Sequence, residues 1–324
     1  MWSASDKPSF LLPFLDTPAM KRIGGVGMNC GCEYTSFPRF RDAGRYTRFT
    51  HSLGAALIVW RFTGDRAQTL AALFHDIATP VFAHSVDFMR GDYLKQESTE
   101  SDTERVIRED PEIGPLLRKL GIAVGDVSDY HRYPIADNDS PRLSSDRLEY
   151  TLGNLLHYGF RQRPELDGYL SDLTAAPAED GMPELQFRTA ETAAAFARGA
   201  LECARVYVSD EDRYAMQRLA ELLRSATDLG VLDARDLMTT EAAVIAKLEA
   251  DPRTAGSWRK YRALHRMVPA EEGDPADCRI IPAKKRCIDP LVTGIGRLSS
   301  SDPAFRAELE AFLNAPLDRR ICAE

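Results

Sequence analysis

The sequence predicts an all-α fold with a small irregular or β-bearing part near the C-terminus. Apolar residues recur at helical spacing through most of the chain, for example over residues 52–60 and 189–208. Capping residues precede several such stretches, as Thr17 and Asp302 do, and each of these two is followed by a proline. Residues 278–292 alternate in the way that favours extended structure.

The first half of the chain contains the predicted helices that matter most for function. A short helix follows Thr17, and the four glycines of residues 24–31 predict backbone packed close to another part of the molecule. Helices are expected over 52–60 and 67–74, one or two over 102–120, and another that begins at Asp146. A basic loop, 39–46, and a polar loop, 125–145, lie between them.

The second half is also mainly helical in pattern. Turn-forming residues around Gly181 predict a short hairpin, and helices are expected over 189–208, 213–229, 241–250 and 255–267, with a last one from Asp302 to Phe312. The chain has no internal repeat, long linker or low-complexity segment. We therefore expect a core over residues 1–165 and a mostly helical extension over 166–324 that packs on this core without forming an independent domain.

Composition narrows the class of protein. A 324-residue chain with 44% hydrophobic residues can build one large core. A net charge of −8 argues against a protein that coats nucleic acid, which needs a basic surface. The longest uncharged apolar run, 53–60, is far shorter than the about 20 residues of a membrane span. No secretory signal pattern opens the chain, so the sequence predicts a cytoplasmic protein without a membrane partner.

The six cysteines show no framework spacing. A second metal site built from Cys30, Cys32, Cys278 and Cys287 is conceivable, but ordinary reduced thiols are the expectation.

Histidines and aspartates gather among apolar helical residues between Arg48 and Asp87. Burying them is costly unless hydrogen bonds or a cation compensate their polar groups. His75 and Asp76 are adjacent, and neighbours on a helix differ by roughly 100° in direction, so both can bind one ion only at a helix end. Pro80 supplies such an end. We expect one divalent metal ion, Mn, Fe, Mg or Zn, with the ligands His51, His75, Asp76 and Asp146.

These residues, in this order, resemble the HD superfamily of metal-dependent phosphohydrolases, and most closely its deoxynucleoside-triphosphate triphosphohydrolase branch. The branch's Arg-Phe-x-His-Ser-Leu-Gly segment is matched by residues 48–54. Its Leu-x-His-Asp-Ile/Leu-Gly-His-Gly-Pro-Phe-x-His-x-x-Asp segment is matched, with some changes, by residues 73–87, and its Asp-Arg/Lys-Leu-Asp-Tyr segment by residues 146–150. The resemblance implies the HD-domain helical fold, a nucleotide substrate and a homo-oligomer.

Several site residues are implied by this resemblance. Arg48 and Arg147 take the places of phosphate-contacting cations, and Tyr150 that of a substrate-contacting tyrosine. The planar fork of the Arg48 guanidinium also suits a phosphate on chemical grounds. His84 takes the place of a catalytic histidine that protonates a leaving oxygen, and Asp87, three residues later, can fix its imidazole.

Four positions depart from the branch pattern. Asn29 stands where a glutamine helps to select the deoxyribose, and Asn154 where an acidic residue meets the sugar hydroxyl. Thr79 and Gln96 each replace a histidine near the metal-binding pair. All four predicted metal ligands are therefore present, whereas two histidines that surround them in the branch are replaced.

The triplet of Lys284, Lys285 and Arg286 concentrates positive charge in an acidic protein and predicts an anion site, for substrate phosphates or a regulatory nucleotide; a solvated edge is the other interpretation. Three functions follow. The first is hydrolysis of a deoxynucleoside triphosphate to deoxynucleoside and triphosphate. The second is hydrolysis of another nucleotide or small phosphoester. The third is a nucleotide-binding regulator with weak turnover.

Overall fold

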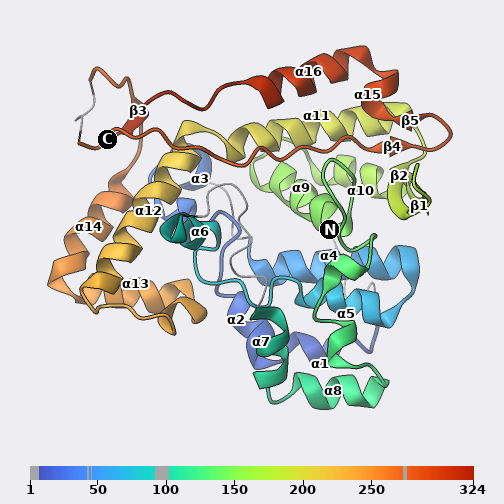
Figure 1. Ribbon diagram of the computed structural model, residues 1–324, viewed down its shortest axis with the longest axis horizontal. Helices are drawn as coiled ribbons and strands as arrows, with labels where there is room; N and C mark the ends of the chain where they lie inside the picture. Colours follow the sequence, from blue (N-terminus) through green and yellow to red (C-terminus); the bar gives the residue numbers. More distant parts are fainter. Residues whose placement is uncertain (1–6, 42–43, 45, 92–101, 273–275) are drawn as a thin grey trace.

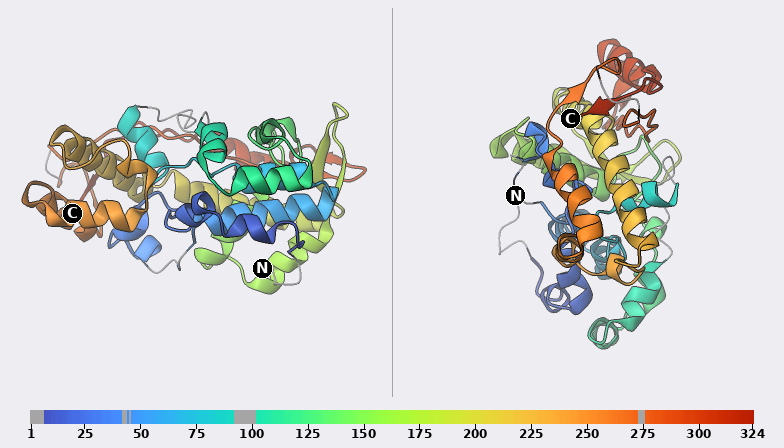
Figure 2. Two further views of the ribbon diagram at one scale, coloured as in Figure 1. Left: turned by 90° about the horizontal axis from the view of Figure 1, so that it is seen from below. Right: turned by 90° about the vertical axis from the view of Figure 1, so that its left-hand side faces the viewer.

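The structure is a computed structural model that describes residues 7–41, 44, 46–91, 102–272 and 276–324. It confirms a mostly helical fold with a small sheet part. Figure 1 shows α12, α13 and α14 at one end of the molecule and the strands β1, β2, β4 and β5 at the other. Figure 2 shows the molecule from below and from the end that carries α12, α13 and α14.

The first half of the chain is helical, as its apolar periodicity predicts. Its helices are α1 (Leu12–Leu15), α2 (Pro18–Ile23), α3 (Pro38–Arg41), α4 (Arg48–Thr63), α5 (Arg66–Phe74), α6 (His84–Arg90), α7 (Thr103–Glu109), α8 (Ile113–Leu120) and α9 (Ser145–His157).

Side-chain caps determine where the helices of the candidate site begin. The hydroxyl of Thr47 accepts a hydrogen bond from the amide of Thr50, so α4 begins at Arg48, four residues before the predicted start. Asp65 caps α5 and Ser144 caps α9 in the same way. Helix α4 packs against both α5 and α9, and α9 packs against α11 (Ala190–Tyr207). This packing brings three distant motifs onto neighbouring helices.

The second half combines helices with short strands. Besides α11 it contains α10 (Arg163–Asp172), β1 (Leu173–Pro177), β2 (Pro183–Phe187), α12 (Asp210–Asp228), α13 (Glu241–Ala250), α14 (Pro252–Ala263), β3 (Met267–Val268), β4 (Leu291–Val292), β5 (Gly296–Arg297), α15 (Leu298–Ser301), α16 (Pro303–Asn314) and β6 (Cys322–Ala323). The predicted hairpin is confirmed, because β1 and β2 pair antiparallel with Leu173 opposite Phe187. Strand β4 joins parallel to β2, β5 pairs antiparallel with β4, and β3 pairs with β6.

Two apolar clusters form the core. The first joins side chains of α4, α5, α9 and α11, and the second joins α12 to residues of α6, α13 and α14. Tyr158 packs against both clusters. The stretch 278–290 contains no strand of its own and crosses the molecule from the side of β3 to β4 (Figure 1). In the described part of the chain, no helix combines the length and apolarity that a bilayer span requires.

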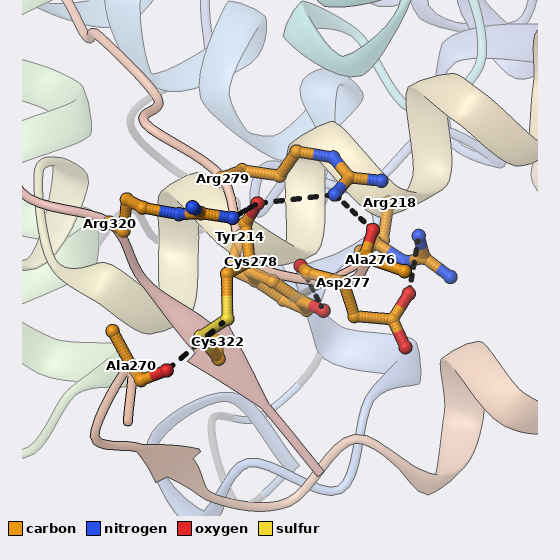
Figure 3. Close-up of a disulfide and its surroundings, with 9 residues drawn as sticks. All are labelled: Tyr214, Arg218, Ala270, Ala276, Asp277, Cys278, Arg279, Arg320 and Cys322. Carbon is orange, nitrogen blue, oxygen red and sulfur yellow. Dashed lines mark hydrogen bonds and ion pairs between the residues drawn. A yellow bond between two sulfur atoms is a disulfide. The ribbon is translucent and has the colours of Figure 1, made fainter. Parts of the chain in front are cut away.

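One cysteine prediction is wrong. Cys278 and Cys322 form a disulfide, and their sequence separation is 44. Figure 3 shows this bond beside Tyr214, Arg279 and Arg320. The pairing of β3 with β6 and the bridge between Arg279 and Ile321 bring the two segments together, and no local sequence spacing reports such an approach. Because Cys278 is bonded, it cannot be a ligand in a second metal site.

Candidate metal centre

The two histidines of the candidate centre point the same ring nitrogen at one another. His51 lies in the first turn of α4, and its Nδ1 is 2.6 Å from Oε2 of Glu149 on α9. His75 lies at the C-terminal end of α5, and its Nδ1–H donates to the carbonyl oxygen of Ala72 at 2.7 Å. The Nε2 atoms of the two rings are therefore left facing each other, 3.0 Å apart.

Two aspartates complete the cluster. Asp146 Oδ1, from the first turn of α9, is 3.0 Å from His51 Nε2 and 3.5 Å from His75 Nε2. Asp76 Oδ2 is 3.5 Å from His75 Nε2 and 3.8 Å from His51 Nε2. The sequence-predicted ligands are thus brought together from α4, α9 and the chain just after α5.

The spacing of these atoms fits a divalent metal ion. The ligand atoms of His51, His75 and Asp76 all lie within 4.8 Å of one another. Metal bonds to nitrogen and oxygen of about 2.0–2.2 Å allow ligand atoms to lie up to about 4.3 Å apart across the ion. The pairs measured above, at 3.0–3.8 Å, already lie within this limit. Two imidazole lone pairs cannot face each other in a buried site without a proton or a cation between them.

The electrostatics of the metal-free cluster point the same way. Burial disfavours a charged His51, but the hydrogen bonds to Asp146 and Glu149 outweigh burial and raise the pKa of this imidazole to about 10. Burial also opposes ionisation of Asp146, and hydrogen bonds from His51 and His75 outweigh it, which holds the pKa of this carboxyl well below its usual range. The surroundings that favour a positive charge on His51 would equally favour a metal cation.

Sequence analysis missed Glu149. Its Oε2 accepts a hydrogen bond from the Tyr46 hydroxyl as well as facing His51 Nδ1, so it fixes the ring orientation of His51. The available signal was the carboxylate of Glu149 itself, inside the motif that begins at Asp146.

Asp76 is held from two sides. Arg48 Nη1 donates to Asp76 Oδ2 at 2.9 Å, and the Thr79 hydroxyl donates to Asp76 Oδ1 at 2.7 Å. Thr79, which replaces a histidine of the resembling family, therefore orients a candidate ligand. Arg48 is 7% exposed, and its Nε has no hydrogen-bond partner among the described residues.

A cavity of about 490 Å³ lies beside the cluster. All the predicted site residues line it except Asp87, which is buried behind His84: these are Asn29, Arg48, His51, His75, Asp76, His84, Asp146, Arg147, Tyr150, Lys284, Lys285 and Arg286. The cavity is thus flanked by the candidate ligands and by the predicted basic residues.

His84 opens α6 and is oriented by a carboxylate. Its Nδ1 is 2.9 Å from Asp87 Oδ2, and its Nε2 is 3.3 Å from Nη2 of Arg286. Burial and the positive charges of Arg286 and Arg48 lower the pKa of His84 despite Asp87. The lowered pKa favours the neutral form of this ring near pH 7.

Arg147 and Lys285 donate hydrogen bonds to protein oxygens. Arg147 donates to the Arg142 carbonyl at 2.9 Å, to Asp137 Oδ1 at 2.9 Å and to Asn138 Oδ1 at 3.0 Å, so it braces the polar loop before α9. Lys285 donates to the Leu313 carbonyl at 2.7 Å at the end of α16. A phosphate contact from either side chain requires some of these bonds to be exchanged.

The inner wall of the cavity is neutral and polar. Asn29 Oδ1 accepts from the Tyr158 hydroxyl at 3.0 Å, and Asn154 Nδ2 donates to the Tyr207 oxygen at 2.7 Å. Sequence analysis missed Tyr158, Tyr207 and Asp212, which also line the cavity. Tyr207 ends an amphipathic helix whose apolar pattern indicates only core packing, so it carried no signal. Gln96 lies outside the described residues.

Comparison with known proteins agrees with this geometry. No family model matches the chain. It is 27% identical over 247 residues to the uncharacterized protein YdhJ of Bacillus subtilis, covering 76% of this chain and 74% of that protein. It is 25% identical over 287 residues to the metal-dependent phosphohydrolase cns2 of Cordyceps militaris, covering 87% of this chain and 80% of that protein.

A solved structure shares the fold. The crystal structure of a hypothetical protein from Aquifex aeolicus superposes with a TM-score of 0.64 at 17% identity, covering 98% of this chain and 92% of that one. At this identity the likeness concerns the fold alone. The relative named as a metal-dependent phosphohydrolase, together with the histidine and aspartate cluster, supports the resemblance of this chain to the HD-domain phosphohydrolase superfamily.

Proposed function

We propose that this protein is a metal-dependent HD phosphohydrolase whose substrate is a nucleotide. One observation carries the proposal: two imidazole Nε2 atoms, 3.0 Å apart, meet two carboxylates beside a cavity with basic residues on its wall. A similar relative is named a metal-dependent phosphohydrolase, which supports the same class of reaction.

The proposed ligands are His51, His75, Asp76 and Asp146. A divalent ion held there supplies Lewis-acid polarisation of a phosphoryl group and lowers the pKa of a bound water. Glu149 holds the His51 ring in place through Nδ1. The mixed nitrogen and oxygen donors can bind Mn, Fe, Mg or Zn.

The remaining roles belong to side chains of the cavity wall. Arg48 and the triplet of Lys284, Lys285 and Arg286 neutralise phosphate charge, as Arg147 does once it exchanges a loop contact. A phosphate beside Arg286 offsets the charge that lowers the pKa of His84. His84, held by Asp87, then carries a proton at Nε2 for the leaving oxygen.

The favoured reaction is cleavage of a deoxynucleoside triphosphate to deoxynucleoside and triphosphate. Its support is the resemblance of residues 48–54, 73–87 and 146–150 to that branch. Asn29, Thr79 and Asn154 favour a second candidate, another nucleotide or a small phosphoester, because they change the groups around the sugar and the leaving oxygen. A nucleotide-binding regulator with weak turnover is the third.

The experiment uses the purified protein stripped of metal and reloaded with Mn²⁺, Fe²⁺, Mg²⁺ or Zn²⁺. Each form is incubated with deoxynucleoside triphosphates, nucleoside triphosphates and nucleoside monophosphates, and triphosphate, pyrophosphate and phosphate are resolved. Triphosphate from a deoxynucleoside triphosphate supports the first reaction, and phosphate alone supports the second. Tight nucleotide binding without product supports the regulator, and neither binding nor product contradicts the proposal.

We also propose a cytoplasmic setting and a homo-oligomer, as the sequence predicts. The disulfide between Cys278 and Cys322 weighs against a reducing compartment. Counting free thiols in protein isolated under alkylating conditions tests the first proposal, and light scattering tests the second.

A further inference from the structure

A buried carboxylate that is not one of the candidate ligands connects two segments that lead into the cavity wall. Glu241 is the first residue of α13 and is 3% exposed. Its Oε1 accepts hydrogen bonds from the amide of Gly27 at 2.9 Å and from the amide of Phe82 at 3.3 Å. Its Oε2 accepts from the hydroxyl of Tyr34 at 2.7 Å. One side chain of the C-terminal half thus accepts hydrogen bonds from two backbone segments of the N-terminal half.

The first segment that Glu241 holds leads directly to His84. Phe82 and Ala83 have φ of +58° and +42°, a region that residues with a Cβ seldom adopt. Two such residues in succession persist only where surrounding contacts impose the conformation. The amide of Phe82 bonds to Glu241, and α6 begins immediately afterwards at His84. The turn therefore sets the direction from which the His84 imidazole enters the cavity.

The second segment that Glu241 holds begins at Gly27. Gly27 precedes Met28, Asn29 and Cys30, all of which line the cavity. Gly27 also bridges to Thr47, the cap of α4, so its position is tied to the start of the helix that carries His51. A Cβ at Gly27 would overlap the carboxylate of Glu33, which leaves glycine as the residue that fits beside the two acids.

We propose that Glu241 is a positioning residue that places His84 relative to the metal centre by clamping the turn at Phe82 and Ala83 to the segment at Gly27. This inference rests on the proposed function, in which His84 takes part in the reaction. The clamp needs hydrogen-bond acceptors at fixed positions rather than a negative charge, and burial raises the pKa of the Glu241 carboxyl. Glutamine, with one carbonyl oxygen for the two amides and a donor for the Tyr34 oxygen, should therefore replace it.

The test compares three variants of the full-length, metal-loaded protein. Glu241→Ala removes both backbone contacts, Glu241→Gln keeps them, and Glu249→Ala is the matched control on the same helix. Glu249 is exposed and bonds Trp258 Nε1 at 3.1 Å, away from the cavity. We expect Glu241→Ala to lower kcat at least about tenfold with little change in KM, because small displacements of a reacting group are costly. Glu241→Gln and Glu249→Ala should stay within about threefold of the parent kcat.

A second measurement does not depend on turnover. The chain has six histidines, so ¹⁵N-labelled imidazole signals are few, and His84→Gln identifies that of His84. In the Zn²⁺ form, the His84 signals should move in Glu241→Ala and stay in place in Glu241→Gln and Glu249→Ala. If Glu241→Ala does not fold, Glu241→Asp replaces it, because the shorter side chain cannot reach both amides.

Each outcome decides one of the two claims. A parent protein that neither binds a nucleotide nor releases product from one contradicts the proposed function, and the imidazole signals still decide the role of Glu241. Unmoved His84 signals in folded Glu241→Ala or Glu241→Asp overturn the positioning role, whatever happens to kcat. If the His84 signals move in Glu241→Gln as they do in Glu241→Ala, hydrogen-bond acceptors at fixed positions are not sufficient, and this part of the proposal is overturned.

Discussion

Asp146 shows how much of the metal centre depends on a single side chain. Its Oδ1 is 3.0 Å from His51 Nε2, closer than the 3.8 Å of Asp76 Oδ2, and both carboxylates are 3.5 Å from His75 Nε2. Asp76, in contrast, is shared with Arg48 and Thr79. At the residue scale, the centre is therefore most sensitive to the loss of Asp146.

The first prediction concerns the variant Asp146→Ala. It should lose both bound metal and turnover, because only three candidate ligands remain and His51 loses its nearest carboxylate at Nε2. Metal content by mass spectrometry of the purified variant checks this. Asp139→Ala is the control, since Asp139 is exposed and lines the same cavity without contacting the histidines. A full complement of metal in Asp146→Ala would show that the fourth ligand is another residue.

The second prediction concerns pH. In the metal-free protein the pKa of His51 is raised to about 10, so the imidazole holds a proton at neutral pH. Metal binding at Nε2 displaces this proton, and affinity should therefore rise with pH by up to about tenfold per unit below pH 10. Calorimetry in buffers of different ionisation enthalpy should count about one proton released per ion at pH 7. An affinity that is flat between about pH 6 and pH 9 would contradict it.

At the scale of elements, the close approach of α4 and α9 builds the support of the centre. Gly54 faces Glu149 across this contact, and a Cβ at Gly54 would overlap the Glu149 carboxylate. The same carboxylate fixes His51. The spacing of two helices and the orientation of one candidate ligand are thus coupled.

The third prediction follows from this coupling. Gly54→Ala should destabilise the fold by about 1–3 kcal/mol through overpacking and should weaken metal binding by displacing Glu149. Denaturant unfolding and metal titration measure the two effects. Gly168→Ala is the matched control, because Gly168 is exposed on α10 with open space around it and alanine should stabilise that helix by about 0.5–1 kcal/mol. If Gly54→Ala folds and its metal affinity is unchanged, the contact between α4 and α9 does not influence metal binding.

The fourth prediction concerns the disulfide of the second half of the chain. The disulfide between Cys278 and Cys322 closes a loop with a sequence separation of 44. Loss of this cross-link in Cys322→Ser should lower the free energy of unfolding by about 2–4 kcal/mol, because the unfolded chain regains freedom. Cys287→Ser, at a half-buried free cysteine, should change it far less. Equal unfolding midpoints of the parent with and without reductant would argue that the bond contributes nothing.

The limits of sequence reasoning follow the range of the interactions involved. The helices and the four candidate ligands could be predicted from the sequence, because periodicity, caps and motif spacing are local signals. Glu149, Tyr207 and the disulfide were not, since their partners lie 98, 53 and 44 positions away in sequence number. The engagement of Arg147 by Asp137 and Asn138 was also hidden, because a basic residue in a motif does not reveal which oxygens surround it.

At the scale of the whole molecule, both halves of the chain build the cavity. The first half brings the candidate ligands, while Tyr207, Asp212 and the triplet 284–286 come from the second. Side chains of α11 join those of α4, α5 and α9 in one apolar cluster. This sharing supports our proposal that residues 166–324 are not an independent domain.

The central claim is that two imidazoles and two carboxylates, distant in sequence, bind one divalent cation beside the cavity. Crystals of the Mn²⁺-loaded protein, with diffraction recorded on both sides of the manganese absorption edge, test it most directly. We expect a single strong anomalous peak within about 2.3 Å of His51 Nε2, His75 Nε2 and one oxygen each of Asp76 and Asp146. A loaded protein whose anomalous peak lies elsewhere, or whose four side chains remain unbound to metal, would contradict the account.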